Sequence, residues 1–393
     1  MSKSNLLKDK ASIVGIGATE FSKDSGRSEM SLACEAVKAA IEDAGLTPQD
    51  VDGMVCFSAE TNPEIDIAKH LGMEELTFYS RIHHGGGAAA ATIQQAAMAV
   101  ATGVADVVVA YRAFNERSGH RFGTGVQDRP PAVNAENALY SWYSPHGLLT
   151  PAQWVAMFAR RYMHETGATS EDFGRVAVAS RTYAATNPKA FFYGRPATLE
   201  DHQNSRWIVE PLHLLDCCQE SDGGQAIVVT STERARDLPN PPAVISAAAQ
   251  GTYPEQEMMT SYYRPQLGIP EMGIVAEQCY ATAGIGPDDI QTAILYDAFS
   301  PMVLLTLEEF RFCPRGEAKD FLRDGHIEAD GRLPINTNGG QLGEAYIHGM
   351  NGIAEAVRQV RGTSVNQVAD VENVLATAGT GVPTSALILH VDR

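Results

Sequence analysis

Residues 44–55 read AGLTPQDVDGMV, and residues 283–294 read AGIGPDDIQTAI. The two stretches share Ala, Gly, Pro and Asp at matching positions, and their apolar positions exchange only Leu, Ile, Val, Met and Ala. Each copy follows an apolar stripe at helical spacing, and its glycine, Gly45 or Gly284, stands where a helix would end in the left-handed conformation. Each copy then leads into a short apolar strand. This duplication predicts a chain built from two similar α/β halves.

A second pair of segments supports the duplication. The glycine-rich turn 85–87 opens an alanine-rich helix, and a strand follows at 106–111. In the other half, the glycine-rich stretch 339–343 precedes a helix at about 349–361 and a strand at 374–377. Alternation of strands and helices indicates mostly parallel sheets that are covered by helices. Two copies suggest two such layers related by a pseudo-twofold axis.

The segment between the halves breaks this rhythm. Residues 114–220 are rich in aromatic residues, prolines and arginines, and we interpret them as a lobe inserted into the first half. The predicted division is therefore a first half of residues 1–113 plus 221–252, an inserted lobe of residues 114–220, and a second half of residues 253–393.

Composition narrows the class of protein. The chain has 393 residues, 44% of them hydrophobic, and a net charge of −18, which argues against nucleic acid or an anionic membrane as a general partner. No apolar run reaches the roughly 20 residues of a membrane span, and no signal peptide is evident, so we expect a cytoplasmic protein. No cysteine or histidine spacing suggests a metal site. A local basic cluster could still bind a polyanionic cofactor, or could simply be solvated surface. Its members are Arg181, Lys189, Arg195 and Arg206.

Two tyrosines lie where parallel sheets collect ligands, at the carboxyl ends of strands. Tyr296 lies in TAILYDAFSPMVLLTLEEF (292–310), at the end of a predicted strand and before a helix that Ser300 would cap. Tyr346 lies in NTNGGQLGEAYIHGMNG (336–352), before a helix whose free amides favour negative charge. Position alone does not separate a catalytic tyrosine from a packed aromatic residue.

Longer segments carry a family resemblance. They are AQWVAMFARRYMHETG (152–167), PLHLLDCCQESDGGQAIVV (211–229) and INTNGGQLGEAYIHGMNGIAEAVRQVRG (335–362). In this order they resemble the thiolase superfamily, and in particular its sterol-carrier-type branch, over nearly the whole chain. The resemblance implies the thiolase fold: two similar βαβαβαββ halves in a five-layer αβαβα arrangement with an inserted loop lobe.

The departures from the thiolase pattern concern the reactive residues. A thiolase carries a nucleophilic cysteine in the turn matching RIHHGGG (81–87) and a second cysteine in the segment matching ATAGTG (376–381). This chain has no cysteine in either segment, and His84 is a possible occupant of the first position. Tyr296 replaces asparagine in the motif NEAF, and Tyr346 replaces histidine in the motif GHP. Thiolases need an acyl-cysteine intermediate, and this chain cannot form one at either expected place.

This combination resembles the thiolase-like retro-aldolases of bacterial steroid side-chain degradation, which are often labelled lipid-transfer proteins. The resemblance implies a carbon–carbon lyase that cleaves a β-hydroxyacyl-CoA, such as a 17-hydroxy-3-oxo-pregnene-20-carboxyl-CoA, into a 17-ketosteroid and propionyl-CoA. No cofactor is implied beyond the coenzyme A of the substrate. It also implies a small OB-fold partner, alone or as a domain of a hydratase subunit, and a homodimer core within an α2β2 heterotetramer.

The resemblance suggests roles for both tyrosines. We expect Tyr346 to be the base and Tyr296 to hydrogen-bond to it or return the proton, with the reverse assignment open. A tyrosine base needs a pKa below its usual value near 10, and a shift of about 3 units corresponds to roughly 4 kcal/mol. Amides at a helix start would lower the pKa, whereas desolvation would raise it.

The remaining site predictions concern the thioester. Backbone amides from Gly379 to Gly381, and less strongly Gly340, could donate to the developing oxyanion, or these glycines could only form turns. His84 could donate to the thioester or be a buried structural histidine.

Two other functions remain open. One is an acyl-CoA thiolase or acyltransferase that uses an unexpected cysteine. The other is a non-catalytic carrier of sterols or acyl-CoA.

Overall fold

The chain folds into two α/β halves, and the computed structural model describes residues 6–83, 85–121, 138, 141–255, 261–379 and 384–392. The strands are β1 (Ala11–Ala18), β2 (Gly53–Phe57), β3 (Phe78–Ile82), β4 (Val107–Asn115), β5 (Trp207–Val209), β6 (Leu212–His213), β7 (Asp222–Ser231), β8 (Ala243–Gly251), β9 (Thr292–Ile294), β10 (Asn373–Ala378) and β11 (Thr384–Val391). The helices are α1 (Glu29–Asp43), α2 (Glu64–Leu71), α3 (Ala89–Ala101), α5 (Pro151–Thr166), α6 (Ser170–Thr186), α7 (Leu199–Asn204), α8 (Thr232–Ala235), α9 (Pro270–Ala283), α10 (Ser300–Glu309), α11 (Ala318–Arg323), α12 (Gly340–Gly343) and α13 (Met350–Arg361).

The main sheet joins both halves. Its strand order is β3-β2-β4-β7-β1-β8-β11-β10-β9, and within the sheet the halves are joined where Ser12 and Ile13 of β1 pair with Val244 and Ala243 of β8. The predicted division placed residues 243–252 in the first half. However, β8 pairs with β11 along its length, so sheet pairing assigns β8 to the second half. The other boundaries stay a prediction.

Strand directions are mixed. The pairs β2–β3, β2–β4 and β9–β10 are parallel, whereas β4–β7, β1–β7, β1–β8, β8–β11 and β10–β11 are antiparallel. The prediction of mostly parallel sheets was therefore wrong. A crossover helix makes neighbouring strands parallel, but β10 and β11 are joined by a short connection, and β7 returns from the inserted lobe.

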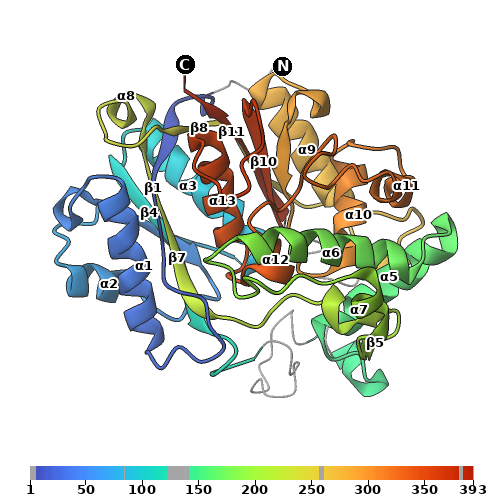
Figure 1. Cartoon of the computed structure of the whole chain (residues 1–393). Helices are drawn as coiled ribbons and strands as arrows, with labels where there is room; N and C mark the ends of the chain where they lie inside the picture. Colours follow the sequence, from blue (N-terminus) through green and yellow to red (C-terminus); the bar gives the residue numbers. More distant parts are fainter. Residues whose placement is uncertain are drawn as a thin grey trace.

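The layers follow the thiolase arrangement that the sequence suggested. Helix α1 packs on β1, β4 and β7, and α9 packs on β8 and β11, so these helices cover the two outer faces. Between the halves, α3 and α13 contact each other and strands of both sides (Figure 1). The order of layers is therefore αβαβα, which confirms the predicted fold.

The repeated stretch has the same local structure in both halves. Gly45 follows α1 with a φ of 69°, and Gly284 follows α9 with a φ of 75°. A short 3₁₀ helix comes next in each copy, η1 (Pro48–Asp50) and η8 (Pro287–Asp289), before β2 or β9 begins. The left-handed glycines and the strands that follow them confirm the prediction from the sequence.

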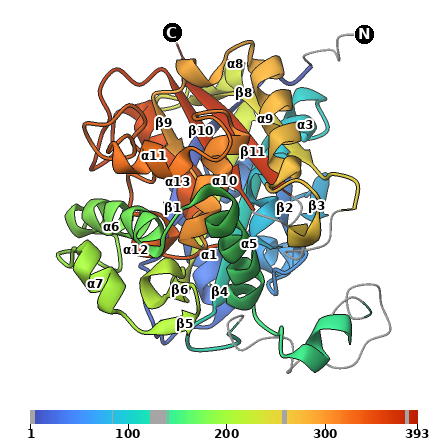
Figure 2. The ribbon, with the colours of Figure 1, turned by 90° about the vertical axis from the view of Figure 1, so that its right-hand side faces the viewer.

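The inserted lobe contains α5, α6 and α7 and packs on the half that follows it in the sequence. Helix α6 contacts α10, α11 and α12, and α5 contacts α10 (Figure 2). Arg323 of α11 donates to Asp172 of α6 at 2.8 Å, and the Tyr162 hydroxyl of α5 donates to Glu308 of α10. The lobe thus contacts the elements that carry both tyrosine motifs. In the described part of the chain, we find no helix with the length and apolarity to cross a membrane.

Candidate active site

The two tyrosines named from the sequence lie side by side. Their hydroxyl oxygens are 3.0 Å apart, and their rings meet edge to face. Tyr296 is buried, and Tyr346 keeps part of its surface exposed. Strand β9 ends at Ile294, two residues earlier than predicted, and the N–H of Tyr296 donates to Thr377 Oγ1 of β10 at 3.0 Å. The loop after β9 is therefore fixed to the sheet at the tyrosine itself.

The first half contributes the surface against which Tyr296 packs. A Cβ added to Gly86, in the turn before α3, would overlap the Tyr296 hydroxyl and lie 3.0 Å from Cε2. A Cβ on Gly349, which has a φ of 86°, would lie 3.1 Å from Tyr296 Cδ2. Only glycine at both positions leaves room for the ring. The turn that holds a cysteine in thiolases here closes around a tyrosine from the other half.

Asp297 points away from the tyrosine pair. Its carboxylate accepts the N–H groups of Gln341 at 2.8 Å and Leu342 at 3.4 Å, and the Ser180 hydroxyl at 3.4 Å. Burial raises the pKa of Asp297 to about 6, although these hydrogen bonds lower it. Asp297 therefore joins the YDAF segment to the start of α12 and to the lobe.

Gly340 is part of this packing. A Cβ on Gly340 would lie 2.7 Å from Asp297 Cγ, and its own N–H donates to Asn338 Oδ1 at 3.0 Å. Because that amide is already engaged, the geometry does not support Gly340 as an oxyanion donor. Gly379 follows β10 with a φ of 78°. Gly381 and His84 lie outside the described residues, so the oxyanion roles of Gly379 and Gly381 and the thioester contact of His84 stay predictions.

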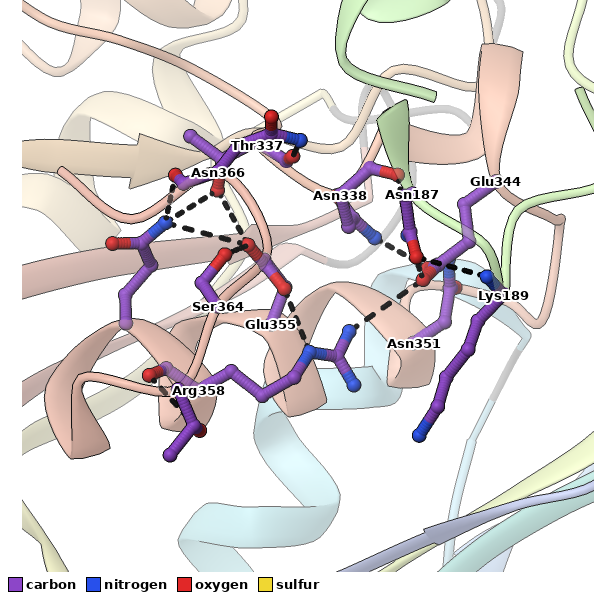
Figure 3. Close-up of polar contacts among 12 residues, drawn as sticks. Asn187, Lys189, Thr337, Asn338, Glu344, Asn351, Glu355, Arg358, Ser364 and Asn366 are labelled. Carbon is purple, nitrogen blue, oxygen red and sulfur yellow. Dashed lines mark hydrogen bonds and ion pairs between the residues drawn. The ribbon is translucent and has the colours of Figure 1, made fainter. Parts of the chain in front are cut away.

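A buried polar network holds the loop that presents Tyr346 (Figure 3). Arg358 of α13 donates to Glu355 at 2.7 Å and lies 3.5 Å from Glu344. Glu344 also accepts from Asn338 and from Asn351, the latter at 2.9 Å. Because Glu344 is held by partners from several segments, the loop between α12 and α13 is fixed two residues before Tyr346.

The Tyr346 backbone has a further anchor. Its N–H donates to Ser221 Oγ at 3.1 Å, just before β7 begins. Tyr346 is therefore held by both halves of the molecule.

Burial raises the pKa of both tyrosines, which is the opposite of the shift that a tyrosine base needs. For Tyr296, the hydrogen bond with Tyr346 lowers the pKa, but burial has the larger effect. For Tyr346, the nearby Tyr296, Cys218 and Glu116 raise the pKa further. The physical reason is that α13 begins at Met350, four residues after Tyr346, so the phenol hydrogen-bonds to another phenol instead of to the helix amides.

A buried cluster that the sequence analysis missed lies behind Tyr346. The ring of His348 meets the Tyr346 ring edge to face at 4.9 Å and stacks on Phe114 at 5.0 Å. Arg112 Nε donates to His348 Nδ1 at 3.0 Å, and Arg112 Nη1 donates to Glu60 at 2.9 Å. A guanidinium can only donate, so His348 accepts through Nδ1 and carries its proton on Nε2. The only sequence signal was the position of His348 in the same glycine-rich segment.

Two more ionisable residues near the pair were also missed as site residues. Cys218, whose N–H donates to Ala298 O at 2.8 Å, and Glu116 both lie within electrostatic range of Tyr296 and Tyr346. Burial raises the pKa of both groups well above their usual values. The position of Glu116 directly after a strand could have singled it out.

Ser300 does not have the capping role predicted for it. Phe299 occupies the N-cap position of α10, and the buried Ser300 hydroxyl donates to Asp216. Asp216 also accepts from His202 Nε2 at 2.8 Å and from the N–H of His213 at 2.7 Å. These bonds connect the lobe to the start of α10.

Comparison with known proteins places this geometry in a family. The family model "Thiolase, N-terminal domain" matches residues 11–233, and "Thiolase C-terminal domain-like" matches residues 256–391. The chain belongs to the thiolase family. The two segments that were matched to the thiolase cysteine motifs, residues 81–87 and 376–381, contain no cysteine.

Three relatives refine the assignment. A protein of Thermomonospora curvata named "Steroid side-chain-cleaving aldolase" is 70% identical over 99% of this chain and 100% of its own length. A Mycobacterium tuberculosis protein named "17-hydroxy-3-oxo-4-pregnene-20-carboxyl-CoA lyase" is 66% identical over 98% and 100%. The solved structure "Ltp2-ChsH2(DUF35) aldolase" superposes with a TM-score of 0.95 at 70% identity, covering 98% of this chain and 99% of that one. The chain is an enzyme of the carbon–carbon lyase class.

The packing of Tyr296 predicts a specific effect of Gly86→Ala. The added methyl group would overlap the Tyr296 hydroxyl, so the ring must move and the 3.0 Å bond to Tyr346 must break. We expect destabilisation by about 1–3 kcal/mol, as for other overpacked sites, and loss of most lyase activity. Urea unfolding and steady-state kinetics measure the two effects. Gly251→Ala, where the nearest atom would be 3.3 Å away, is the control. Wild-type activity in Gly86→Ala would show that the close packing is unimportant.

Asp297→Asn should change the dependence of stability on pH. The pKa of Asp297 is about 6 in the folded protein and near 3.9 when unfolded, so its contribution to stability is fully present below pH 4 and is lost as the pH rises through 6. Asparagine stays neutral. The unfolding free energy of the variant relative to wild type should therefore rise between pH 4 and 7, by up to about 3 kcal/mol. Urea unfolding across this range tests the slope, with exposed Asp324→Asn as control. A difference that is constant with pH contradicts the prediction.

Proposed function

We propose that this lyase cleaves a β-hydroxyacyl-CoA by a retro-aldol reaction in which Tyr296 and Tyr346 transfer the protons. The proposed substrate is a 17-hydroxy-3-oxo-pregnene-20-carboxyl-CoA, and the products are a 17-ketosteroid and propionyl-CoA. The observation that carries the proposal is the 3.0 Å contact between two tyrosine hydroxyls at two thiolase motif positions. The names of the relatives that are 70% and 66% identical support the substrate class.

The reaction needs one base and one acid. A phenolate takes the proton of the β-hydroxyl, and the bond between the hydroxyl carbon and the α-carbon breaks. Its electron pair moves into the thioester enolate, while the hydroxyl carbon becomes a ketone. The enolate α-carbon then takes a proton, so no proton is gained or lost overall. We assign the role of base to Tyr346, because part of its surface is exposed. The buried Tyr296 would support it through the hydrogen bond between the two hydroxyl groups.

Donors for the enolate oxygen belong to the same proposal. Backbone amides from Gly379 to Gly381 would hold the oxyanion. Coenzyme A is part of the substrate, so the proposed reaction requires no separate cofactor.

The basic cluster of the lobe offers a contact for the coenzyme A phosphates. The guanidinium groups of Arg181 and Arg195 lie over the ring of Phe192 at 3.5 Å and 4.8 Å. Burial, and then the charge of Arg195, lower the pKa of Arg181 to about 10. A bound anion would relieve the repulsion between the two cations. Lys189 and Arg206 are not needed for this contact.

A second protein belongs to the proposal. The solved structure with a TM-score of 0.95 is a complex that contains a DUF35 component. We propose a partner of this OB-fold kind, alone or as a domain of a hydratase subunit, bound to a homodimer core in an α2β2 assembly. The cytoplasmic location, like the absence of nucleic-acid and membrane partners, stays a prediction.

The acyl-cysteine alternative has one candidate near the pair, Cys218. Burial and the neighbouring Glu116, Cys217, Asp297 and Glu220 raise the pKa of its thiol. A thiol of raised pKa forms little thiolate at neutral pH and is a poor nucleophile. We therefore expect no covalent adduct after incubation with acyl-CoA, and intact-protein mass spectrometry measures this. An acyl adduct on Cys218 would favour the alternative.

Replacing each tyrosine tests the proposed chemistry. Tyr296→Phe and Tyr346→Phe remove only hydroxyl groups, so both variants should fold and bind the partner but lose at least about 100-fold in cleavage, as expected for acid–base catalysis. Release of propionyl-CoA from the steroid thioester is the measurement. Tyr183→Phe is a matched control, because Tyr183 is buried and its hydroxyl has no hydrogen-bond partner among the described residues. Near-normal turnover in both single variants would contradict the proposed mechanism. Substrate binding without cleavage by wild type would favour a carrier.

A further inference from the structure

A buried carboxyl group, Glu116, lies beside the tyrosine pair. Glu116 is 3% exposed and directly follows β4, whose last residue, Asn115, pairs with Asp222 of β7. This register brings Glu116 opposite Ser221. The Ser221 amide lowers the pKa of the Glu116 carboxyl group, and the Ser221 hydroxyl accepts the N–H of Tyr346 at 3.1 Å. Ser221 therefore lies between Glu116 and the Tyr346 backbone.

The position of Glu116 is fixed at the end of the β4–β7 strand pair. Asp222 accepts the N–H groups of Arg117 at 2.8 Å and Ser118 at 3.0 Å, directly after Glu116. The carboxyl group therefore does not depend on a long, unanchored loop for its location.

One oxygen of this carboxyl group has no partner. Glu116 Oε2 is buried and makes no hydrogen bond to any residue that the structure describes. Burying a polar oxygen without a partner costs about 1–3 kcal/mol, and an ionised carboxylate costs more. A side chain that destabilises the fold in this way suggests a role outside folding.

The proposed tyrosine chemistry needs a further group that accepts a proton from the phenol. Burial raises the pKa of both phenols, which favours their protonated forms at neutral pH. A phenolate base can form only if another group takes a proton. Among the described residues around the pair, Glu116 is an acceptor with a free oxygen.

We propose that Glu116 acts through Tyr346 as the residue that accepts its proton and so generates the phenolate base. This inference rests on the proposed retro-aldol function. One proton leaves the Tyr346 hydroxyl and one arrives at the Glu116 carboxylate, through a bridging water, because no direct hydrogen bond joins the two side chains. Glu116 then holds that proton while Tyr346 takes the β-hydroxyl proton and returns one to the enolate.

The groups around Glu116 act on its pKa in both directions. Glu220 raises the pKa of Glu116 beyond the effect of burial, and Arg112, Lys23 and the Ser221 amide lower it. The titratable and charged groups facing the carboxyl group come from several segments: Lys23 after β1, Arg112 on β4, Cys218 and Glu220 before β7, and Tyr296 and Tyr346 of the second half. The carboxyl group and the phenol pair can thus share a single negative charge.

Glu116→Gln in the complete complex with the partner tests the inference. Glutamine keeps the shape but cannot take a proton, so kcat at pH 7 should fall by at least about 100-fold with little change in KM. The loss should shrink as the pH rises to 10, because the solvent can then deprotonate the phenol. Glu116→Asp keeps a carboxyl group and should retain the wild-type shape of the pH profile at a lower rate.

Glu308→Gln is the matched control. Glu308 is also a buried carboxyl group of raised pKa, but it accepts from Tyr162 and the N–H of Ala318, near the end of α10 remote from the YDAF motif. Its variant should keep the wild-type pH profile of activity.

Three outcomes would overturn the inference. They are an unchanged kcat and pH profile in Glu116→Gln, a loss that is equal at every pH, or a Glu116→Asp variant that behaves like Glu116→Gln. Failure of the underlying function looks different. In that case wild type releases no propionyl-CoA, or the tyrosine variants keep their activity.

Discussion

The packing of the Tyr296 ring against Gly86 and Gly349 is the contact on which the rest of the site depends. The two glycines precede α3 and α13, the helices that form the layer shared by the two halves. Because neither glycine has a side chain, the ring can lie at the meeting point of these helix starts and reach Tyr346. The internal duplication therefore also shapes the active site. It brings two corresponding turns to one place, where a residue of one half fills space left by the other.

The same region concentrates buried acids. Asp297, Glu344 and Glu116 are nearly inaccessible, and burial raises the pKa of each. Glu344 is compensated by Arg358 and two asparagines, and Asp297 by helix amides, whereas one oxygen of Glu116 lacks a partner. The hydrogen bonds to Asp297 and Glu344 offset the desolvation of these two carboxyl groups, and they also hold the loops in place. Burial of Glu116 without such compensation does not favour stability, which agrees with the proton-exchange role proposed for it.

Much of the fold was predictable because its signals are local. Gly45 and Gly284 mark helix ends in the sequence, and the motifs around Tyr296 and Tyr346 follow strands whose apolar character is evident. Strand direction and the place of β8 were not predictable from local pattern, since they depend on which distant strands pair. Glu116 and His348 were missed as site residues for the same reason: Glu220 and Ser221 approach Glu116, and Arg112 approaches His348, from more than a hundred positions away. The sign of the tyrosine pKa shifts also required the structure, because desolvation depends on the burial of the finished fold.

The packing of the inserted lobe has a consequence for synthesis on the ribosome. Helices α5 and α6 emerge well before α10, α11 and α12, the elements on which they pack. Until those residues are translated, the apolar faces of the lobe have no native surface to cover them. The lobe therefore completes its packing only after the second half has been translated, and until then its apolar faces can bind chaperones or neighbouring nascent chains.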